Sequence, residues 1–281
     1  MEGPKGTGVA TIEVRSYDPL EKAKLEALAQ RVVQELGSEL ADLKLLAFFD
    51  NGDDSILRQE LGLSNRGFYS PVKRNNRKLW PPEMALLIFP SVYGVPWEQT
   101  MPGFEHGIYL HGTTCSDETA LVMTFAHELQ HCVQYVHNRK LWAESRLIRL
   151  IHKTIQDAER LNWPDVSHER EARIVAKRVA VCICGAEAVK RYIERKLAES
   201  QKQVGFGDLG DAIRREVEDW RFIRDLNPCI PYDLSVETSR IFQRLRRYRP
   251  ELEDVLRKER AGVYKEEYSD VDLSVYFNAP P

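Results

Sequence analysis

Residues 117–137 read Asp117-Glu-Thr-Ala-Leu-Val-Met-Thr-Phe-Ala-His-Glu-Leu-Gln-His-Cys-Val-Gln-Tyr-Val-His137. Apolar side chains recur in this run at helical spacing, which predicts a single amphipathic helix over 117–137. Ser116 is the expected N-cap of this helix. Asp117 and Glu118 suit its first turn, because carboxylates are stabilised at the positive end of the helix dipole.

His127 and His131 are four residues apart in this predicted helix. Side chains at that spacing lie on one face, one turn above the other, so the two imidazoles can bind a single metal ion. Glu128 follows the first histidine directly and can reach a metal-bound water without being a ligand itself. This HExxH pattern is typical of zinc hydrolases.

Two strands are expected upstream of the motif helix, at residues 84–92 and 107–111. A strand followed by a helix with HExxH resembles the zincin metallopeptidase fold. The resemblance covers roughly residues 84–180. It implies that the strand before the active-site helix is an edge strand, with which a peptide substrate can pair.

The rest of the chain is expected to be mixed in secondary structure. Its patterns predict strands at 9–17 and 43–49, a loop or hairpin at 64–82, and helices at 19–36, 141–161, 168–200, 208–225 and 236–259. We therefore expect an α+β, zincin-like fold: a small mixed N-terminal sheet with the active-site helix, then a mainly helical C-terminal part. The expected domains are a zincin-like metallopeptidase domain at 1–204 and a helical C-terminal extension at 205–281, packed on or beside it.

Composition narrows the class of protein. The net charge of −3, with 30% charged residues, gives the 281-residue chain no overall basic character and makes nucleic acid an unlikely partner. No apolar run approaches the roughly 20 residues that span a bilayer, and the N-terminus lacks a signal-peptide pattern. Five cysteines without a CxxC pair are typical of reduced thiols in a cytoplasmic protein.

A catalytic zinc ion needs three protein ligands and one open position. His137 is one candidate, because HELQHCVQYVH has the histidine spacing of the metzincins, with Gln134 where that family has glycine. If the helix continues past Gln134, however, His137 lies roughly 15 Å along the axis from His127. The four methionines are at 1, 84, 101 and 123, so none lies downstream to form a Met-turn.

Glu171 is the preferred third ligand. It lies near the start of a predicted helix, and the pattern E-x-E-A-x-x-x-A from Glu169 to Ala176 is similar to the second motif of the ImmA/IrrE-like metallopeptidases. The gluzincin arrangement, in which a glutamate on a later helix completes the site, implies zinc held by His127, His131 and Glu171. Glu171 follows His131 by 40 residues. This separation departs from the shorter spacing expected of the ImmA/IrrE-like metallopeptidases. Glu169, which would face elsewhere on the same helix, and Glu144 remain alternatives.

The resemblance also implies roles in catalysis on a peptide or protein substrate. Zinc lowers the pKa of its bound water towards ~7, and Glu128 acts as the general base that passes the proton to the leaving amine. A further donor usually helps to stabilise the oxyanion. His168 is the first candidate because it precedes Glu171 by three residues on the same helical face; the others are Tyr135, His111 and Tyr192.

A second interpretation is a zincin scaffold retained as a regulatory or binding module. The basic segment 240–249, which has interleaved aromatic residues, would then contact nucleic acid or an acidic protein partner. Acidic residues follow it directly, which favours a solvated, internally paired helix. A hydrolase of a non-peptide amide is a third possibility, although the cysteine motif of peptide deformylase is missing around Cys115.

Overall fold

The computed structural model describes residues 10–16, 19–49, 67–71, 104–110, 114, 117–139, 141–142, 145, 167–203, 210–229, 250–251, 253–254 and 257–258. The chain divides into two compact units. One comprises Met1–Val133 with Val175–Val189, and the other comprises Gln134–Ile174 with Lys190–Pro281. Two continuous helices, α6 (Glu118–His137) and α8 (Ser167–Cys184), pass from one unit into the other.

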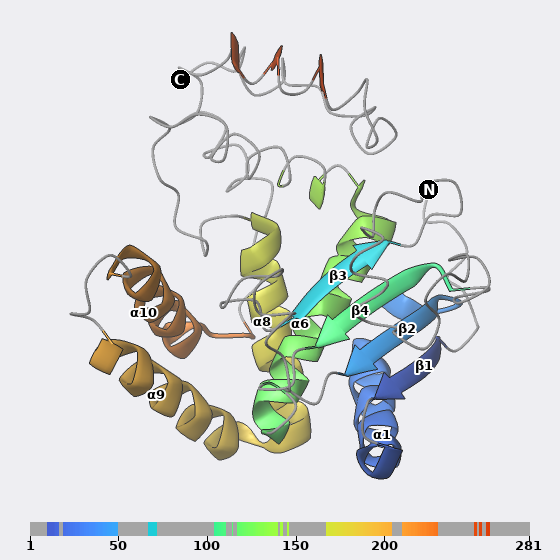
Figure 1. The fold of residues 1–281 in the computed structure, drawn as a ribbon, viewed down its shortest axis with the longest axis horizontal. Helices are drawn as coiled ribbons and strands as arrows, with labels where there is room; N and C mark the ends of the chain where they lie inside the picture. The colour runs from blue at the N-terminus through green and yellow to red at the C-terminus, as the bar shows by residue number, and fades with distance from the viewer. Residues whose placement is uncertain are drawn as a thin grey trace. The chain divides into compact units, whose positions relative to one another are not determined.

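A four-stranded mixed sheet lies in the first unit (Figure 1). Its strands are β1 (Thr11–Ser16), β2 (Lys44–Phe49), β3 (Gly67–Pro71) and β4 (His106–Leu110), in the order β1-β2-β4-β3. β1, β2 and β4 are parallel, whereas β3 is antiparallel to β4. The prediction of a small mixed N-terminal sheet followed by mainly helical chain is confirmed for the described residues.

The polar segment 64–82, predicted as a loop or hairpin, contains strand β3. One expectation about this sheet was wrong. The strand that precedes the motif helix, β4, is not an edge strand, because it pairs with β2 on one side and β3 on the other. β3 instead lies at the end of the described sheet. Sequence patterns report single strands, whereas strand order depends on pairings between distant segments.

Two helices pack on one face of the sheet. α1 (Pro19–Leu36) joins β1 to its parallel neighbour β2, a connection that needs a crossover rather than a tight turn. Phe49 on β2 packs against Phe125 of α6, with ring centroids 5.8 Å apart, and side chains of α1 line the same small space as these two rings. Leu121, Phe125 and Leu129 of α6 are fully or almost fully buried.

The helix boundaries follow local chemistry. α1 has the predicted bounds and ends at Gly37, whose φ of +63° is readily adopted by glycine. α6 also matches its prediction, but its N-cap is Asp117 rather than Ser116, because Asp117 Oδ1 accepts a hydrogen bond from Ala120 N at 3.0 Å. An aspartate is as good a cap as a serine, so composition alone could not separate the two.

The predicted helix 168–200 is two helices, α8 and α9 (Ala186–Gln203). Gly185 separates them with a φ of +85°, a left-handed conformation that ends an α-helix. α10 (Gly210–Asp225) lies close to its predicted range of 208–225. Among the described helices, none combines the length and apolar content needed to cross a bilayer.

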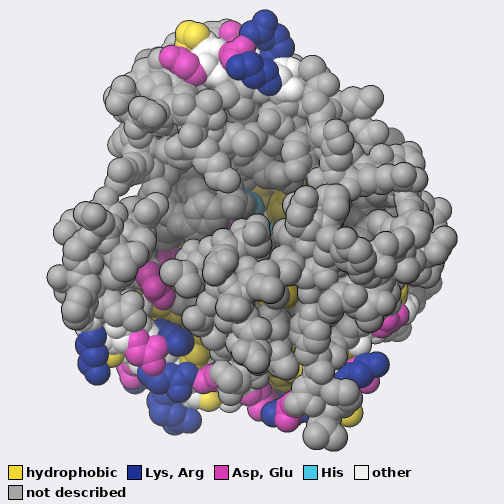
Figure 2. All heavy atoms as spheres, in the orientation of Figure 1, with side chains coloured by type: hydrophobic (Ala, Val, Ile, Leu, Met, Phe, Trp, Pro, Cys, Tyr) yellow, Lys and Arg dark blue, Asp and Glu magenta, His cyan; other side chains and the backbone are white. Residues whose placement is uncertain are grey.

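Several predictions fall outside the described residues. These are the strand at 84–92, most of the helices at 141–161 and 236–259 with the basic segment 240–249, and the proposed domain boundary after residue 204. On the face shown in Figure 2, acidic and basic side chains are intermixed among the residues that the structure describes. That mixing agrees with the small net charge of the chain.

Candidate metal centre

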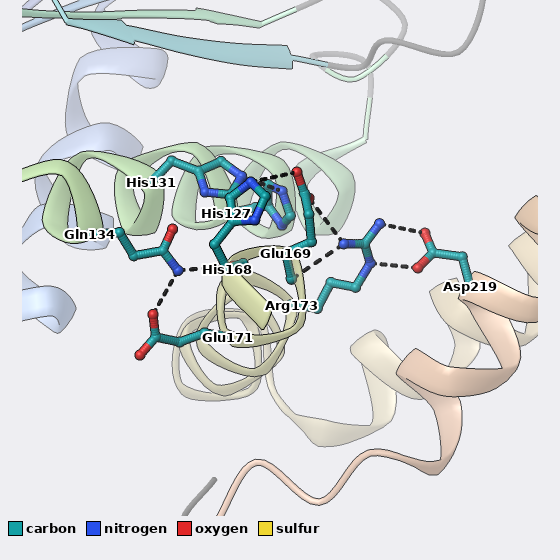
Figure 3. A network of polar contacts seen from close by, with 8 residues as sticks. All are labelled: His127, His131, Gln134, His168, Glu169, Glu171, Arg173 and Asp219. Atoms are coloured by element: carbon teal, nitrogen blue, oxygen red, sulfur yellow. Dashed lines mark hydrogen bonds and ion pairs between the residues drawn. The ribbon is translucent and has the colours of Figure 1, made fainter. Parts of the chain in front are cut away.

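His127 and His131 point their imidazoles towards one another from successive turns of α6 (Figure 3). Their Nε2 atoms are 3.1 Å apart, and the rings meet edge to face with centroids 4.6 Å apart. Two imidazole nitrogens bound to one tetrahedral zinc ion, each at about 2.0–2.1 Å, are separated by about 3.3 Å. The spacing in the structure is close to that value, so the pair could share an ion.

Glu169 on α8 completes a group that could hold a metal ion. One carboxylate oxygen of Glu169 and one ring nitrogen from each of His127 and His131 all lie within 4.8 Å of one another. Glu169 is only 3% exposed. No other group of this kind, built from histidine, cysteine or acidic side chains, occurs in the part of the chain that the structure describes.

The two helices that carry these ligands run antiparallel and are joined near both ends. At the C-terminal end of α6, Gln134 Nε2 donates hydrogen bonds to His168 O at 2.8 Å and to Glu171 Oε2 at 2.6 Å. At the N-terminal end of α6, Thr119 is hydrogen-bonded to the side chain of Cys184, the last residue of α8. Gln134 thereby ties the C-terminal end of α6 to the first turn of α8.

The structure separates the roles of Glu169 and Glu171. Residues two apart on a helix point about 200° away from each other, so one helix cannot present both carboxylates to the same ion. Glu169 faces the histidines, whereas Glu171, the preferred ligand from sequence, binds Gln134 (Figure 3). Glu169, which the sequence offered as an alternative on the same helix, is therefore the glutamate that the fold brings to His127 and His131.

His168 is completely buried, and its ring packs edge to face against Trp142 with centroids 5.9 Å apart. Its Nε2 lies 3.3 Å from Glu169 Oε1. The predicted oxyanion donor therefore lies against the glutamate of the metal group, in a position that protein side chains enclose.

The other sequence candidates lie elsewhere. α6 continues through Gln134 without a turn, and His137 is exposed at its last residue, which removes the metzincin geometry. Tyr135 packs edge to face on Trp142, with centroids 5.9 Å apart. Tyr192 packs in the same way on Trp220, at 5.6 Å. His111 and Glu144 lie outside the described residues.

Glu128, the expected general base, is on α6 and is only 7% exposed. Cys132 follows His131 on the same helix and is completely buried. Burial raises the pKa of the Cys132 thiol well above its usual range, and Cys132 is not part of the group formed by His127, His131 and Glu169. Cys132 therefore contributes to the packing of α6 rather than to the metal group.

Sequence reasoning missed the residues that surround Glu169. Arg173 Nη1 donates to Glu169 Oε2 at 3.2 Å, and Arg173 Nη2 donates to Asp219 Oδ2 on α10 at 2.9 Å. Burial opposes the charge of Arg173, but the Asp219 and Glu169 carboxylates outweigh burial and raise the pKa of the guanidinium above its ordinary value. Glu169 and Arg173 are four residues apart, a spacing that predicts an ion pair on a helix. No pattern in the sequence indicates that Asp219, 46 positions from Arg173, joins this pair.

No family model, curated protein or solved structure matches this chain. The chemistry of the donor set is therefore the basis for assigning an ion. Two imidazoles and one carboxylate are the ligands of many catalytic zinc sites, with a fourth position left for water. The residues present thus fit zinc.

Proposed function

We propose that this chain is a zinc-dependent peptidase of the zincin class, in which His127, His131 and Glu169 hold the metal. The observation that supports the proposal best is the 3.1 Å approach of the two histidine Nε2 atoms, with the buried Glu169 carboxylate in range. A glutamate carried by a later helix corresponds to the gluzincin arrangement, with Glu169 in place of Glu171. The substrate class is a peptide or protein.

The role of zinc in this proposal is to activate a water molecule and to polarise the substrate carbonyl. Glu128 follows His127 on α6, and it accepts the proton that the attacking water loses and delivers it to the leaving amine. His168 contacts Glu169, so we assign it to the support of that carboxylate rather than to the oxyanion.

Glu128→Gln tests the proposal. The amide keeps the size of the side chain but cannot take up a proton, so we expect peptide cleavage to fall by about 10²–10⁴-fold, with zinc content unchanged. Cleavage is measured with a library of fluorescence-quenched peptides, and zinc by elemental analysis.

Glu118→Gln is the matched control, since it makes the same change at an exposed position on the same helix. It should leave both readouts unchanged. Zinc-dependent cleavage that survives in Glu128→Gln would refute the general-base assignment. A zinc-loaded parent protein that cleaves no peptide in the library would refute the peptidase proposal.

A further inference from the structure

The Glu169 carboxylate needs support to serve as a ligand. It is a charged group in a buried position, where an ion without partners is strongly destabilised. A glutamate side chain also has several rotatable bonds, so a binding site gains affinity when neighbouring groups hold it in one geometry. The partners of Glu169 therefore bear directly on metal binding.

Arg173 supplies that support from one helical turn further along α8. Its Nη1 donates to Glu169 Oε2 at 3.2 Å and lies 3.3 Å from Glu169 O, to which it also donates. One guanidinium nitrogen thus contacts both the side chain and the backbone of the proposed ligand. Oε2 is held in this way, while Oε1 lies beside His168.

Asp219 on α10 fixes the guanidinium itself. Arg173 Nη2 and Nε both pair with the Asp219 carboxylate, Nη2 at 2.9 Å from Oδ2, so the contact is bidentate (Figure 3). A bidentate arginine–carboxylate pair sets the orientation of the guanidinium as well as its position. α10 is anchored on α8 a second time, because the Arg170 guanidinium lies 5.0 Å from the centre of the Phe222 ring.

The charges in this chain of contacts also suit a cation. Two carboxylates, Glu169 and Asp219, flank the single guanidinium of Arg173, which leaves one net negative charge. Ligating carboxylates in metal proteins are commonly held by such outer hydrogen bonds.

We propose that Arg173 and Asp219 are positioning residues that hold Glu169 as the third metal ligand. Through Asp219, α10 then contributes to the geometry of the metal centre. The inference rests on the proposed zinc site, but not on peptide hydrolysis. It assigns a role to part of the chain after residue 204, which the sequence left without one. Arg173 contacts Glu169 and is itself held by Asp219, whereas Glu171 is bound by Gln134.

Arg173→Lys and Asp219→Asn test the positioning role, with zinc alone as the probe. Lysine keeps the charge of Arg173 but lacks the planar fork, so a purely electrostatic role leaves the affinity unchanged. We expect each variant to bind zinc about 10–100-fold more weakly than the parent, measured by competition with a chelator of known affinity. The double variant should be no weaker than the weaker single variant, because Asp219 acts through Arg173.

Asp225→Asn is the matched control. Asp225 also pairs with an arginine, Arg224, on the same helix, but both side chains are exposed. It should bind zinc like the parent. The cobalt-substituted proteins provide a second readout, since the visible absorption bands of Co²⁺ report ligand geometry: they should change in Arg173→Lys and stay constant in Asp225→Asn. Circular dichroism of the metal-free proteins checks that each variant is folded.

Parent-like zinc affinity and cobalt spectra in folded Arg173→Lys and Asp219→Asn would overturn the inference and leave the zinc peptidase proposal intact. The converse result is equally distinct. Weaker zinc binding in both variants, in a protein that cleaves no peptide, supports the positioning role and refutes the peptidase. A parent protein that takes up no zinc overturns both.

Discussion

At the residue scale, the metal group shows what a single sequence can and cannot specify. His127, Glu128 and His131 are set by one helical turn, so their relation follows from local spacing alone. The choice between Glu169 and Glu171 does not. It depends on which face of α8 meets α6, and that face is fixed by contacts such as the one from Gln134 to His168 O, across 34 positions of sequence.

The helix that carries the histidines depends on another single residue, its N-cap. We predict that Asp117→Ala lowers the free energy of unfolding by about 0.5–2 kcal/mol, because Ala120 N loses its acceptor. Chemical denaturation of the metal-free protein measures the change. Asp117→Asn keeps a side-chain oxygen that can cap the helix and should be close to the parent. Equal losses in the two variants would mean that the charge of Asp117, and not its capping bond, stabilises α6.

At the scale of elements, the prediction succeeded where hydrophobic period and end signals agreed. α1, α6 and α10 each have a strong helical pattern with clear boundaries. The bounds of β3 and its pairing with β4 were not predicted, because its five residues lie in a segment read only as a hairpin or loop and no local pattern encodes the pairing.

The break between α8 and α9 was missed for a related reason. An isolated glycine is tolerated within a helix, so Gly185 alone did not reveal that the backbone turns there. We predict that Gly185→Ala lowers the free energy of unfolding by about 1–2 kcal/mol, because an L-residue is strained at a φ of +85°. An added Cβ would meet nothing within 4 Å, so strain is the main cost.

Urea denaturation compares Gly185→Ala with Gly185→Asn, since asparagine adopts left-handed backbone more readily than alanine. Asparagine should therefore cost less. An alanine variant as stable as the parent would show that α8 and α9 can join as one helix without loss, as the hydrophobic pattern had predicted.

At the scale of the whole molecule, the class of fold was accessible from sequence but its assembly was not. The mixed sheet and the later helices follow from patterns along the chain. The insertion of β4 between β2 and β3, and the approach of α8 to α6, arise from contacts between distant segments. Arg173 and Asp219, 46 positions apart, belong to this second class and were not predicted.

The proposed zinc site consists of His127, His131 and Glu169. The zinc content of the purified parent, Glu169→Gln and Glu171→Gln, measured after dialysis against a chelator, shows whether Glu169 is the third ligand. We predict about one zinc per chain in the parent and in Glu171→Gln, and little in Glu169→Gln, because a neutral amide is a poor zinc ligand. Zinc lost from Glu171→Gln but retained by Glu169→Gln would contradict the assignment, and a parent without zinc would contradict the site itself.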